Sequence, residues 1–346
     1  MIRLQNDYTS GVHPRVLSSL VRASKEEYSG YGTDEKTDSV GKTVLKTCNR
    51  TEGAVFFVKS GTQANTAAIS FLLKPTDCVL CTATGHIATQ ETGALAGVGH
   101  AVQVLPGSLS KVDAKSLQAY CLAYETDSSP SHLTKPAVLY LSFPNEIGQT
   151  YTLEELEAIS HVCVEHGLFL YIDGARLFYG LDAEASVTLS DIARLADVFT
   201  IGTTKCGALS AEAIVFRNKA LAHRFDAHLR RAGALSARGW VCAVQIEALL
   251  KNRLAWRLAH TANTKSGKLA EVFAKAGISF VSQTKTNMQF VRLHRQHIKA
   301  LKRICEFQIQ RRFDDGSVQA RFCTTWATPA SIITRIARAL KEIDHV

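Results

Sequence analysis

Short apolar segments alternate with helix-like stretches from about residue 54 to residue 216. This alternation limits the fold more than any other feature of the sequence. The strand-like segments are residues 54–58, 78–81, 102–105, 137–141, 168–172 and 198–201. The first of them is followed directly by a helix-like stretch at residues 63–73. Strands that alternate with helices form a mostly parallel sheet covered on both faces, so we predict an α/β domain.

The sequence changes character after about residue 235, where this alternation ends. Residues 239–276 show long helical periodicity, and shorter strand-like pieces follow. A chain of 346 residues is also long enough to divide into two domains. We therefore predict a large domain with an N-terminal arm at residues 1–235. Residues 236–346 are predicted to form a linking helix and a small α+β domain.

Two predicted helices begin with capping signals. Thr152 and Glu155 have the spacing of a capping box, in which a threonine caps the helix and a glutamate three residues later bonds back. The last helix is predicted from about residue 329 to residue 343, with Thr328 as N-cap and Pro329 in the first turn.

The formal net charge of +9 raises the question of a nucleic-acid partner. The basic excess lies mainly in helix-like stretches of the C-terminal half, where solvated helix faces explain it. No aromatic-interleaved basic motif accompanies it, so we predict no nucleic-acid partner. A basic cleft that attracts carboxylate and phosphate groups would use the same charge better.

The chain has none of the sequence signs of a membrane or secreted protein. No apolar run approaches the roughly 18 residues that a membrane-spanning helix needs, and the first residues lack a signal-peptide pattern. The nine cysteines are an odd number and sit largely in apolar runs. We therefore predict a cytoplasmic protein without membrane contact, because free buried cysteines favour a reducing compartment.

Cys78 and Cys81 match the spacing of a C-x-x-C motif. They lie in a predicted strand, where residues three apart point to opposite faces of the sheet. No second cysteine pair is present to complete a metal site. We therefore predict that the protein holds no metal.

An aspartate and a lysine each follow one of the predicted strands. Asp173 comes directly after residues 168–172, and Lys205 follows residues 198–201 after a short turn. A lysine can form a Schiff base with the aldehyde of pyridoxal 5'-phosphate (PLP), and a carboxylate can hold its pyridine nitrogen protonated. The pair therefore suits PLP chemistry. An ordinary exposed lysine and a local salt bridge between Asp173 and Arg176 would explain the same residues.

A turn of small and hydroxyl residues follows the first predicted strand. Ser60, Gly61 and Thr62 lie where a helix begins, and backbone N–H groups at such a turn can bind an anion such as a phosphate. An ordinary helix cap explains the turn equally well. The turn has neither the G-x-G-x-x-G nor the Walker A pattern, which argues against a dinucleotide or a nucleoside triphosphate.

Two further side chains suit a site that binds an amino acid and a flat ring. His86, with Glu91 five residues later, could stack on a heteroaromatic ring or move protons, and it could equally cap a helix. Arg176 could bind a substrate carboxylate through two parallel hydrogen bonds.

In this order, the motifs resemble those of the PLP-dependent threonine aldolases, within the broader β-eliminating lyase group. The matching elements are Asn6-Asp7, Tyr31-Gly32, Ser60 to Asn65, His86 with Glu91, Asp173 to Arg176, Thr203 to Lys205, Thr286 to Met288 and Arg321-Phe322. The resemblance runs along nearly the whole chain. It implies the aspartate-aminotransferase-like fold (fold type I), with a large domain and a smaller C-terminal domain.

The resemblance also implies how the cofactor is bound. Lys205 would be the Schiff-base lysine, and Asp173 would pair with the pyridine nitrogen. Gly61 and Thr62 would bind the phosphate, and His86 would stack on the ring. The remaining residues implied in the cofactor site are Ser60, Arg176 and Thr204.

The implied substrate residues are more widely spread. Arg176 and Arg321 would hold the substrate carboxylate, Asn6 would lie beside it, and Tyr31 would come from the dimer partner. Two positions depart from the family pattern. Serine is common where Asn6 stands, and an arginine usual after the lysine is replaced by Ser236, with Arg238 displaced.

The implied reaction is the retro-aldol cleavage of L-threonine, L-allo-threonine or another β-hydroxy amino acid to glycine and an aldehyde. The family forms homodimers or homotetramers with shared active sites, and low diastereomer specificity is typical of it. We assign removal of the β-hydroxyl proton to His86. An aminotransferase or a β-eliminating lyase is the alternative within PLP enzymes, and a non-catalytic binding protein is the alternative outside them.

Overall fold

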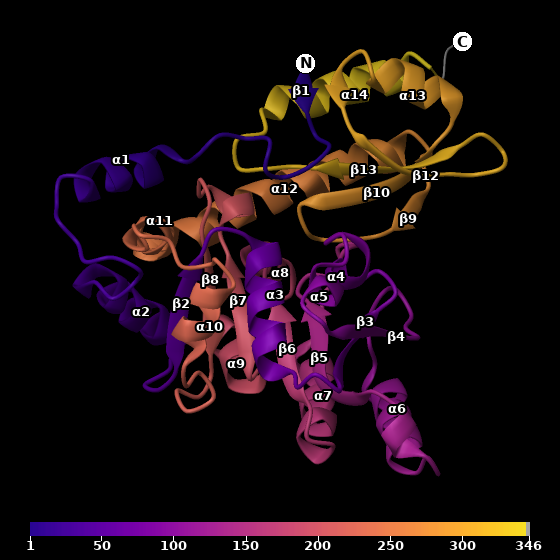
Figure 1. Cartoon of the computed structure of the whole chain (residues 1–346). Helices are drawn as coiled ribbons and strands as arrows, with labels where there is room; N and C mark the ends of the chain where they lie inside the picture. Colours follow the sequence, from indigo (N-terminus) through magenta and orange to yellow (C-terminus); the bar gives the residue numbers. More distant parts are fainter. Residues whose placement is uncertain (344–346) are drawn as a thin grey trace.

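A seven-stranded sheet forms the centre of the computed structural model, which describes residues 1–343 (Figure 1). Its strands are β2 (Ala54–Val58), β3 (Asp77–Thr82), β4 (Ala101–Leu105), β5 (Lys135–Ser142), β6 (Phe169–Asp173), β7 (Val198–Gly202) and β8 (Glu212–Phe216). Their order across the sheet is β2-β8-β7-β6-β5-β3-β4. The strands from β7 to β4 pair in parallel, and β8 pairs antiparallel with both β7 and β2. The predicted mostly parallel sheet is confirmed, with β8 as a strand beyond the six predicted segments.

Helices cover both faces of this sheet, as an α/β fold requires. One face is covered by α2 (Glu35–Thr47), α6 (Ala114–Glu125), α7 (Leu153–Glu165), α8 (Leu177–Ala183) and α9 (Leu189–Leu195). The other is covered by α3 (Gly61–Leu72), α4 (His86–Thr89), α5 (Ala94–Gly97) and α10 (Phe225–Arg231). Cys78 lies in the first core and Cys81 in the second, so the two cysteines point to opposite faces, as predicted.

A four-stranded antiparallel sheet and three helices form the smaller unit, which lies above the large sheet in Figure 1. Its strand order is β12-β13-β10-β9. The strands are β9 (Phe280–Ser282), β10 (Met288–Leu293), β12 (Gln308–Arg312) and β13 (Val318–Cys323). The helices are the later part of α12 (Leu254–Lys275), α13 (Arg295–Leu301) and α14 (Ala330–Lys341). This is the predicted α+β arrangement.

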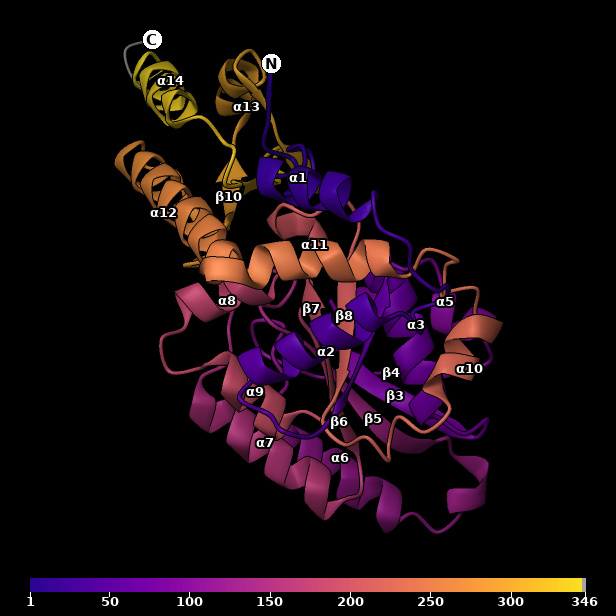
Figure 2. The ribbon, with the colours of Figure 1, turned by 90° about the vertical axis from the view of Figure 1, so that its left-hand side faces the viewer.

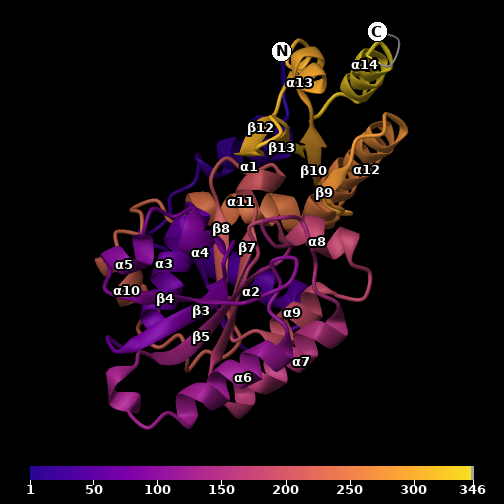
Figure 3. The same cartoon turned by 90° about the vertical axis from the view of Figure 1, so that its right-hand side faces the viewer.

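The predicted linking helix is two helices. Helix α11 (Trp240–Leu250) packs between α1 (Pro14–Ala23) and α2 (Figure 2). A break at Asn252 and Arg253, both with φ of 53°, separates it from α12. Figure 3 shows α12 running from the large domain towards α14.

The core clusters show with which sheet each helix of the C-terminal part packs. Residues from Cys242 to Ala262 join the core of the large domain, because α11 is apolar on nearly every side. The core of the small domain begins at Leu269. It also includes Leu4, because β1 (Ile2–Arg3) pairs in parallel with β11 (Cys305–Glu306). The N-terminal arm therefore packs on the small domain.

One predicted helix start is confirmed and the other is wrong. Thr152 caps α7, and Glu155 completes the capping box. Helix α14 begins at Ala330, because Pro329 has an extended backbone (ψ 135°) and is itself the N-cap. The hydroxyl of Thr328 instead accepts a hydrogen bond from the N–H of Thr325 at 2.8 Å.

Across residues 1–343, no helix has both the length and the apolar character that crossing a membrane requires. All nine cysteines are buried and unpaired by disulfides.

Candidate active site

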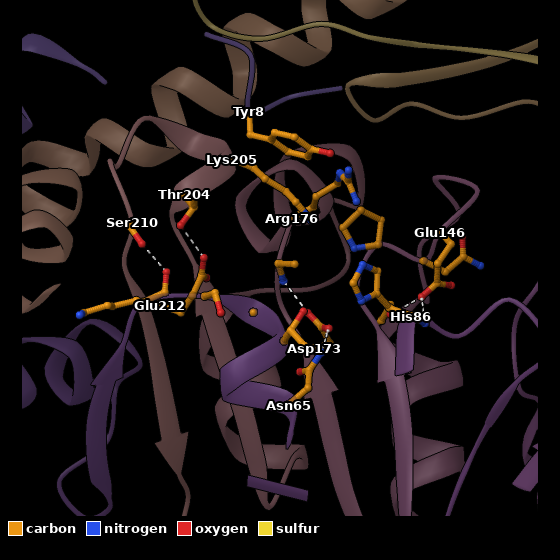
Figure 4. Close-up of a pocket in the computed structure, with 18 residues that line it drawn as sticks. Tyr8, Asn65, His86, Glu146, Asp173, Arg176, Thr204, Lys205, Ser210 and Glu212 are labelled. Atoms are coloured by element: carbon orange, nitrogen blue, oxygen red, sulfur yellow. Dashed lines mark hydrogen bonds between the residues drawn. The ribbon is translucent and has the colours of Figure 1, made fainter. Parts of the chain in front are cut away.

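A cavity of about 340 Å³ lies at the carboxyl ends of β5, β6 and β7 (Figure 4). Open parallel sheets bind ligands at this edge. The predicted residues that line it are Ser60, Gly61, Thr62, His86, Asp173, Arg176, Thr204 and Lys205. Asn6, Tyr31 and Arg321 are not among its lining residues. The structure thus brings all the predicted cofactor residues to one place, and of the predicted substrate residues only Arg176.

Asp173 is the last residue of β6, and three donors hold its carboxylate. Oδ2 accepts from Asn65 Nδ2 at 2.8 Å and from the hydroxyl of Tyr140 at 2.7 Å. Oδ1 accepts from the N–H of Ala175 at 2.8 Å. These three donors fix the position of the carboxylate. A fixed anion at this position is suited to a protonated pyridine nitrogen.

The turn after Asp173 requires glycine. A Cβ added to Gly174 would lie 2.0 Å from the carbonyl oxygen of Thr200, which is closer than any real contact. The N–H of Gly174 also donates to Thr200 Oγ1 at 2.8 Å. Strand β7 therefore holds the turn that carries Asp173 and Arg176.

Asn65, on α3, connects Asp173 to the histidine wall of the cavity. Its Nδ2 donates to Asp173 at 2.8 Å and to Glu91 Oε1 at 2.8 Å. The same Glu91 oxygen lies 2.7 Å from Nδ1 of His86. Glu91 is buried, so it fixes the His86 ring against the cavity. A ring held in this way can stack on a flat cofactor.

Lys205 follows β7 in a short 3-10 turn, and the hydroxyl of Tyr179 donates to its backbone carbonyl at 2.6 Å. Burial lowers the pKa of the Lys205 amine, and the charge of Arg176 lowers it further. The carboxylates of Asp7, Asp173 and Glu212 oppose this shift in pKa without reversing it. A lysine with a lowered pKa is more often unprotonated, the form that attacks an aldehyde.

The turn from β2 into α3 forms the side of the cavity that suits a phosphate. Ser60 is the N-cap of α3, and its hydroxyl accepts from the N–H of Gln63 at 3.3 Å. A Cβ built on Gly61 would meet nothing within 4 Å, so the backbone there is open. The N-terminus of a 12-residue helix favours an anion. Ser60, Gly61 and Thr62 therefore fit a phosphate group.

Glu212 is a buried carboxylate at the start of β8, below Thr204 in Figure 4. The hydroxyl of Thr204 donates to its Oε1 at 2.7 Å. Burial raises the pKa of Glu212 to about 7, against the lowering effects of this hydrogen bond and of the Lys205 charge. The hydroxyl of Thr204, predicted to contact the cofactor, is thus bonded to Glu212.

Arg176 forms a two-pronged ion pair with Asp7 of the N-terminal arm. Nε donates to Asp7 Oδ2 at 2.7 Å, and Nη2 donates to Oδ1 at 3.0 Å. Asn287 Nδ2 adds a third donor to Oδ2 at 3.0 Å. Burial alone would raise the pKa of Asp7, but the charges of Arg176 and Lys205 and these hydrogen bonds lower it. The two bonds to Asp7 leave Nη1 of Arg176 for a ligand.

Arg321 and Asn6 lie behind this pair. Arg321 Nη2 donates to the carbonyl of Gln5 at 3.2 Å. Its Nε is buried and has no hydrogen-bond partner among residues 1–343. Asn6 uses its Oδ1 to accept from the N–H of Tyr8 at 3.1 Å. Asn6 thus stabilises the turn of the arm, whereas Arg321 keeps a donor for a further acceptor.

Tyr31 lies outside the cavity of its own chain and is 42% exposed. The guanidinium of Arg230 lies 3.9 Å from the centre of its ring. Its N–H donates at 3.2 Å to the carbonyl of Ala237, between Ser236 and Arg238. The segment after the lysine in which the sequence departs from the expected pattern, residues 236–238, therefore adjoins Tyr31.

Three acidic residues in or behind the cavity wall were not predicted as site residues: Asp7, Glu146 and Glu212. Asp7 lies nearly 170 positions from Arg176, and no local pattern pairs them. Glu146 follows β5 in a loop, and Glu212 begins a strand that was not among the predicted segments. Glutamate at the carboxyl end of a strand was the only available signal for Glu146.

The residues fit PLP: an amine with lowered pKa, an anion for the ring nitrogen, a ring-stacking histidine and an open helix N-terminus for the phosphate. Fold and site together define a PLP-dependent enzyme of fold type I. The family described as beta-eliminating lyase matches residues 4–296. The chain belongs to this family.

Relatives and a solved structure agree with this assignment. The low specificity L-threonine aldolase of Pseudomonas aeruginosa is 30% identical, over 98% of this chain and 96% of its own. The enzyme of the same description from a Pseudomonas species is 28% identical over the same shares of the two chains. The structure of the Leishmania major threonine aldolase superposes with a TM-score of 0.95, at 34% identity and 99% coverage of both chains.

Proposed function

We propose that this protein cleaves L-threonine, L-allo-threonine and related β-hydroxy amino acids to glycine and an aldehyde by a retro-aldol reaction. The observation that carries the proposal is the position of Lys205, Asp173 and Arg176 around one cavity. These groups serve the amine, the ring and the carboxylate of a PLP-bound amino acid. The names of the relatives support the aldolase reaction in particular.

Residues on two sides of the cavity would hold the cofactor. Asp173 would keep a proton on the pyridine nitrogen, and His86 would lie against the ring. Ser60, Gly61 and Thr62 would bind the phosphate. Bound PLP supplies an aldehyde that joins an amine and a ring that accepts an electron pair.

Lys205 would hold the cofactor until the substrate amine takes its place. The lowered pKa of its amine favours the unprotonated form, which joins an aldehyde. Once free, the amine could take up a proton from solvent and pass it to the substrate Cα, which completes glycine.

Arg176 would orient the substrate through its carboxylate. Asp7 fixes the plane of the guanidinium through Nε and Nη2, and Nη1 takes no part in that pair. Arg321, whose Nη2 donates to the carbonyl of the arm residue Gln5, would support this site from outside the cavity lining. A carboxylate fixed in this way sets the direction of the Cα–Cβ bond, which decides which bond breaks. Asn6 would act on this site through the turn of the arm.

The β-hydroxyl proton must leave as the Cα–Cβ bond breaks. His86, whose Nδ1 is held by Glu91, is the base expected from the sequence.

A β-eliminating lyase is the second candidate, because the family carries that description. Product analysis separates the possibilities. An aldolase releases acetaldehyde and glycine from L-threonine, a β-eliminating lyase releases ammonia and a keto acid, and an aminotransferase turns over only with an added keto acid.

The proposal includes a cytoplasmic homodimer or homotetramer with shared active sites. Its support is Tyr31, which is 42% exposed and lies outside the cavity of its own chain, where it could reach a partner's site. Sedimentation analysis of the purified protein tests the assembly.

A further inference from the structure

Two carboxylates line opposite walls of the cavity, Glu212 and Glu146 (Figure 4). Glu212 lies on the phosphate side, because β8 pairs Glu212 with Val58 at the end of β2. Glu146 lies on the other side, beside His86 and Pro144. If the substrate amine lies at Lys205 and the substrate carboxylate at Arg176, the substrate side chain can face the wall that carries Glu146 and His86.

We propose that Glu146 is the base that takes the β-hydroxyl proton. This inference rests on the proposed aldolase function and changes the assignment to His86. The β-hydroxyl O–H bond breaks and its proton goes to the Glu146 carboxylate. The C–O bond becomes the C=O of the aldehyde, and the Cα–Cβ electron pair stays with the amino-acid fragment, where bound PLP stabilises it. A proton from solvent is then added at Cα and completes glycine, and Glu146 returns its proton to solvent, so the protons balance and no other reactant is consumed.

Hydrogen bonds fix the Glu146 carboxylate against the His86 wall. Oε1 accepts from the N–H of His86 at 3.0 Å and from the hydroxyl of Ser142 at 2.6 Å. Oε2 has a single long contact, with the hydroxyl of Thr84 at 3.4 Å. Oε2 is therefore the oxygen that is best placed to meet a substrate hydroxyl.

A chain of hydroxyl groups stabilises the protonated form of Glu146. The Tyr140 hydroxyl donates its only hydrogen to Asp173, and Ser142 Oγ lies 3.0 Å from Tyr140 and 2.6 Å from Glu146. While Glu146 is charged, the Ser142 hydroxyl has one hydrogen for two neighbours, Tyr140 and Glu146, so one of these two contacts has no hydrogen. A proton taken up at Oε2 removes the charge of the carboxylate, so Oε1 needs the Ser142 hydrogen less and keeps the N–H of His86. The Ser142 hydrogen can then serve Tyr140.

The surroundings also favour proton uptake. Burial raises the pKa of Glu146, and the charge of Asp173 raises it further, while the bonds from Ser142 and His86 partly oppose the shift. A base works best when its pKa lies near the operating pH. The position and the chemistry of Glu146 thus agree.

The test compares Glu146→Gln with the wild-type holoenzyme and with Glu157→Gln, a matched change on the surface helix α7. Glutamine keeps the acceptor for His86 and Ser142 but cannot take a proton. Three quantities are measured: acetaldehyde released from L-threonine, exchange of the α-proton of glycine in D2O, and the visible absorbance of bound PLP. Glycine has no β-hydroxyl group, so its exchange does not need this base.

We expect E146Q to lose at least about 100-fold in cleavage, with exchange and absorbance close to those of wild type. Cleavage near the wild-type rate would overturn the proposal. A wild-type enzyme that exchanges glycine but cleaves no β-hydroxy amino acid would instead refute the proposed function.

If E146Q also loses exchange and absorbance, one explanation is that the substitution has disturbed the whole site. The Glu146→Asp variant then distinguishes a disturbed site from a lost base. This variant keeps a carboxylate but withdraws it by one methylene. If E146D loses more of its cleavage rate than of its glycine-exchange rate, Glu146 is upheld as the base. Equal losses in the two rates would overturn the proposal.

Infrared titration of the cofactor-free protein gives a readout that does not depend on turnover. The wild type should show a protonated carboxyl band that persists above the usual glutamate range and that E146D shifts or E146Q removes. The same titration in wild type and variants would contradict the proposal.

Discussion

Arg176 and Asp7 form two hydrogen bonds, of 2.7 and 3.0 Å, although 169 positions separate them in the chain. Asp7 also accepts from Asn287, which directly precedes β10 of the small domain. The pair therefore ties the N-terminal arm, the large sheet and the small domain together at the wall of the cavity. It explains how Arg176 can be both buried and oriented for a carboxylate.

Replacing Asp7 by asparagine should destabilise the protein by about 3 kcal/mol, because it leaves the Arg176 charge buried without its partner. The pKa of Asp7 is lowered in the folded state, so its stabilisation is complete above the unfolded pKa of aspartate. The loss should therefore be the same from about pH 5 to pH 8. Urea denaturation of D7N and wild type measures it. A loss below about 1 kcal/mol would mean that the pair is not important for stability.

Lys205 should carry the cofactor, and Lys59, which also lines the cavity, should not. Borohydride reduction of the holoenzyme followed by peptide mass analysis should place the PLP mass on Lys205. The K205A variant should lack the visible absorbance band of bound PLP. Label on Lys59, or a band that persists in K205A, would contradict this assignment.

Asp173→Asn should reduce turnover by about 10²-fold or more while PLP still binds. The amide has no charge for the ring nitrogen, and its NH2 group would face a donor, Ala175 N–H or Tyr140 hydroxyl. Steady-state kinetics together with cofactor titration separates the two effects. Near-normal turnover in D173N would remove Asp173 from the mechanism.

Glu212 should make the stability of the protein depend on pH in a range over which the Asp7–Arg176 pair contributes a constant amount. Its folded pKa is about 7, above the usual value, so the folded state holds its proton more tightly than the unfolded chain. Wild-type stability should fall, relative to Glu212→Gln, as the pH rises from the unfolded pKa of glutamate to about 7. Over this pH range the free energy of unfolding of the wild type should fall by at most about 3 kcal/mol relative to E212Q. Thermal melts of the wild type and E212Q at several pH values measure this difference. If the melting temperatures of the two proteins change with pH in the same way, the prediction is wrong.

The sequence predicted the parts of the fold that have local signals. Six apolar segments bounded by turns became strands, and the Thr152 capping box formed as predicted. The packing of α11 and of the N-terminal arm could not be predicted, because it depends on which core each of them joins. Pro329 showed a similar limit, since its place outside α14 depends on the Thr325–Thr328 turn.

The same distinction holds for the site. Residues in short motifs, such as Ser60 to Thr62 and Asp173 to Arg176, lie on the cavity because strand ends place them there. Glu146 lies on the cavity beside His86, and Asp7 acts on it only through its pair with Arg176. No spacing in the sequence records either contact.

Release of acetaldehyde and glycine from the four stereoisomers of threonine tests the account most directly. The wild-type holoenzyme should form the two products in equal amounts from L-threonine and L-allo-threonine, with little product from the D isomers and none in K205A. Release of 2-oxobutyrate and ammonia, or a requirement for an added keto acid, in place of acetaldehyde would contradict the proposed function.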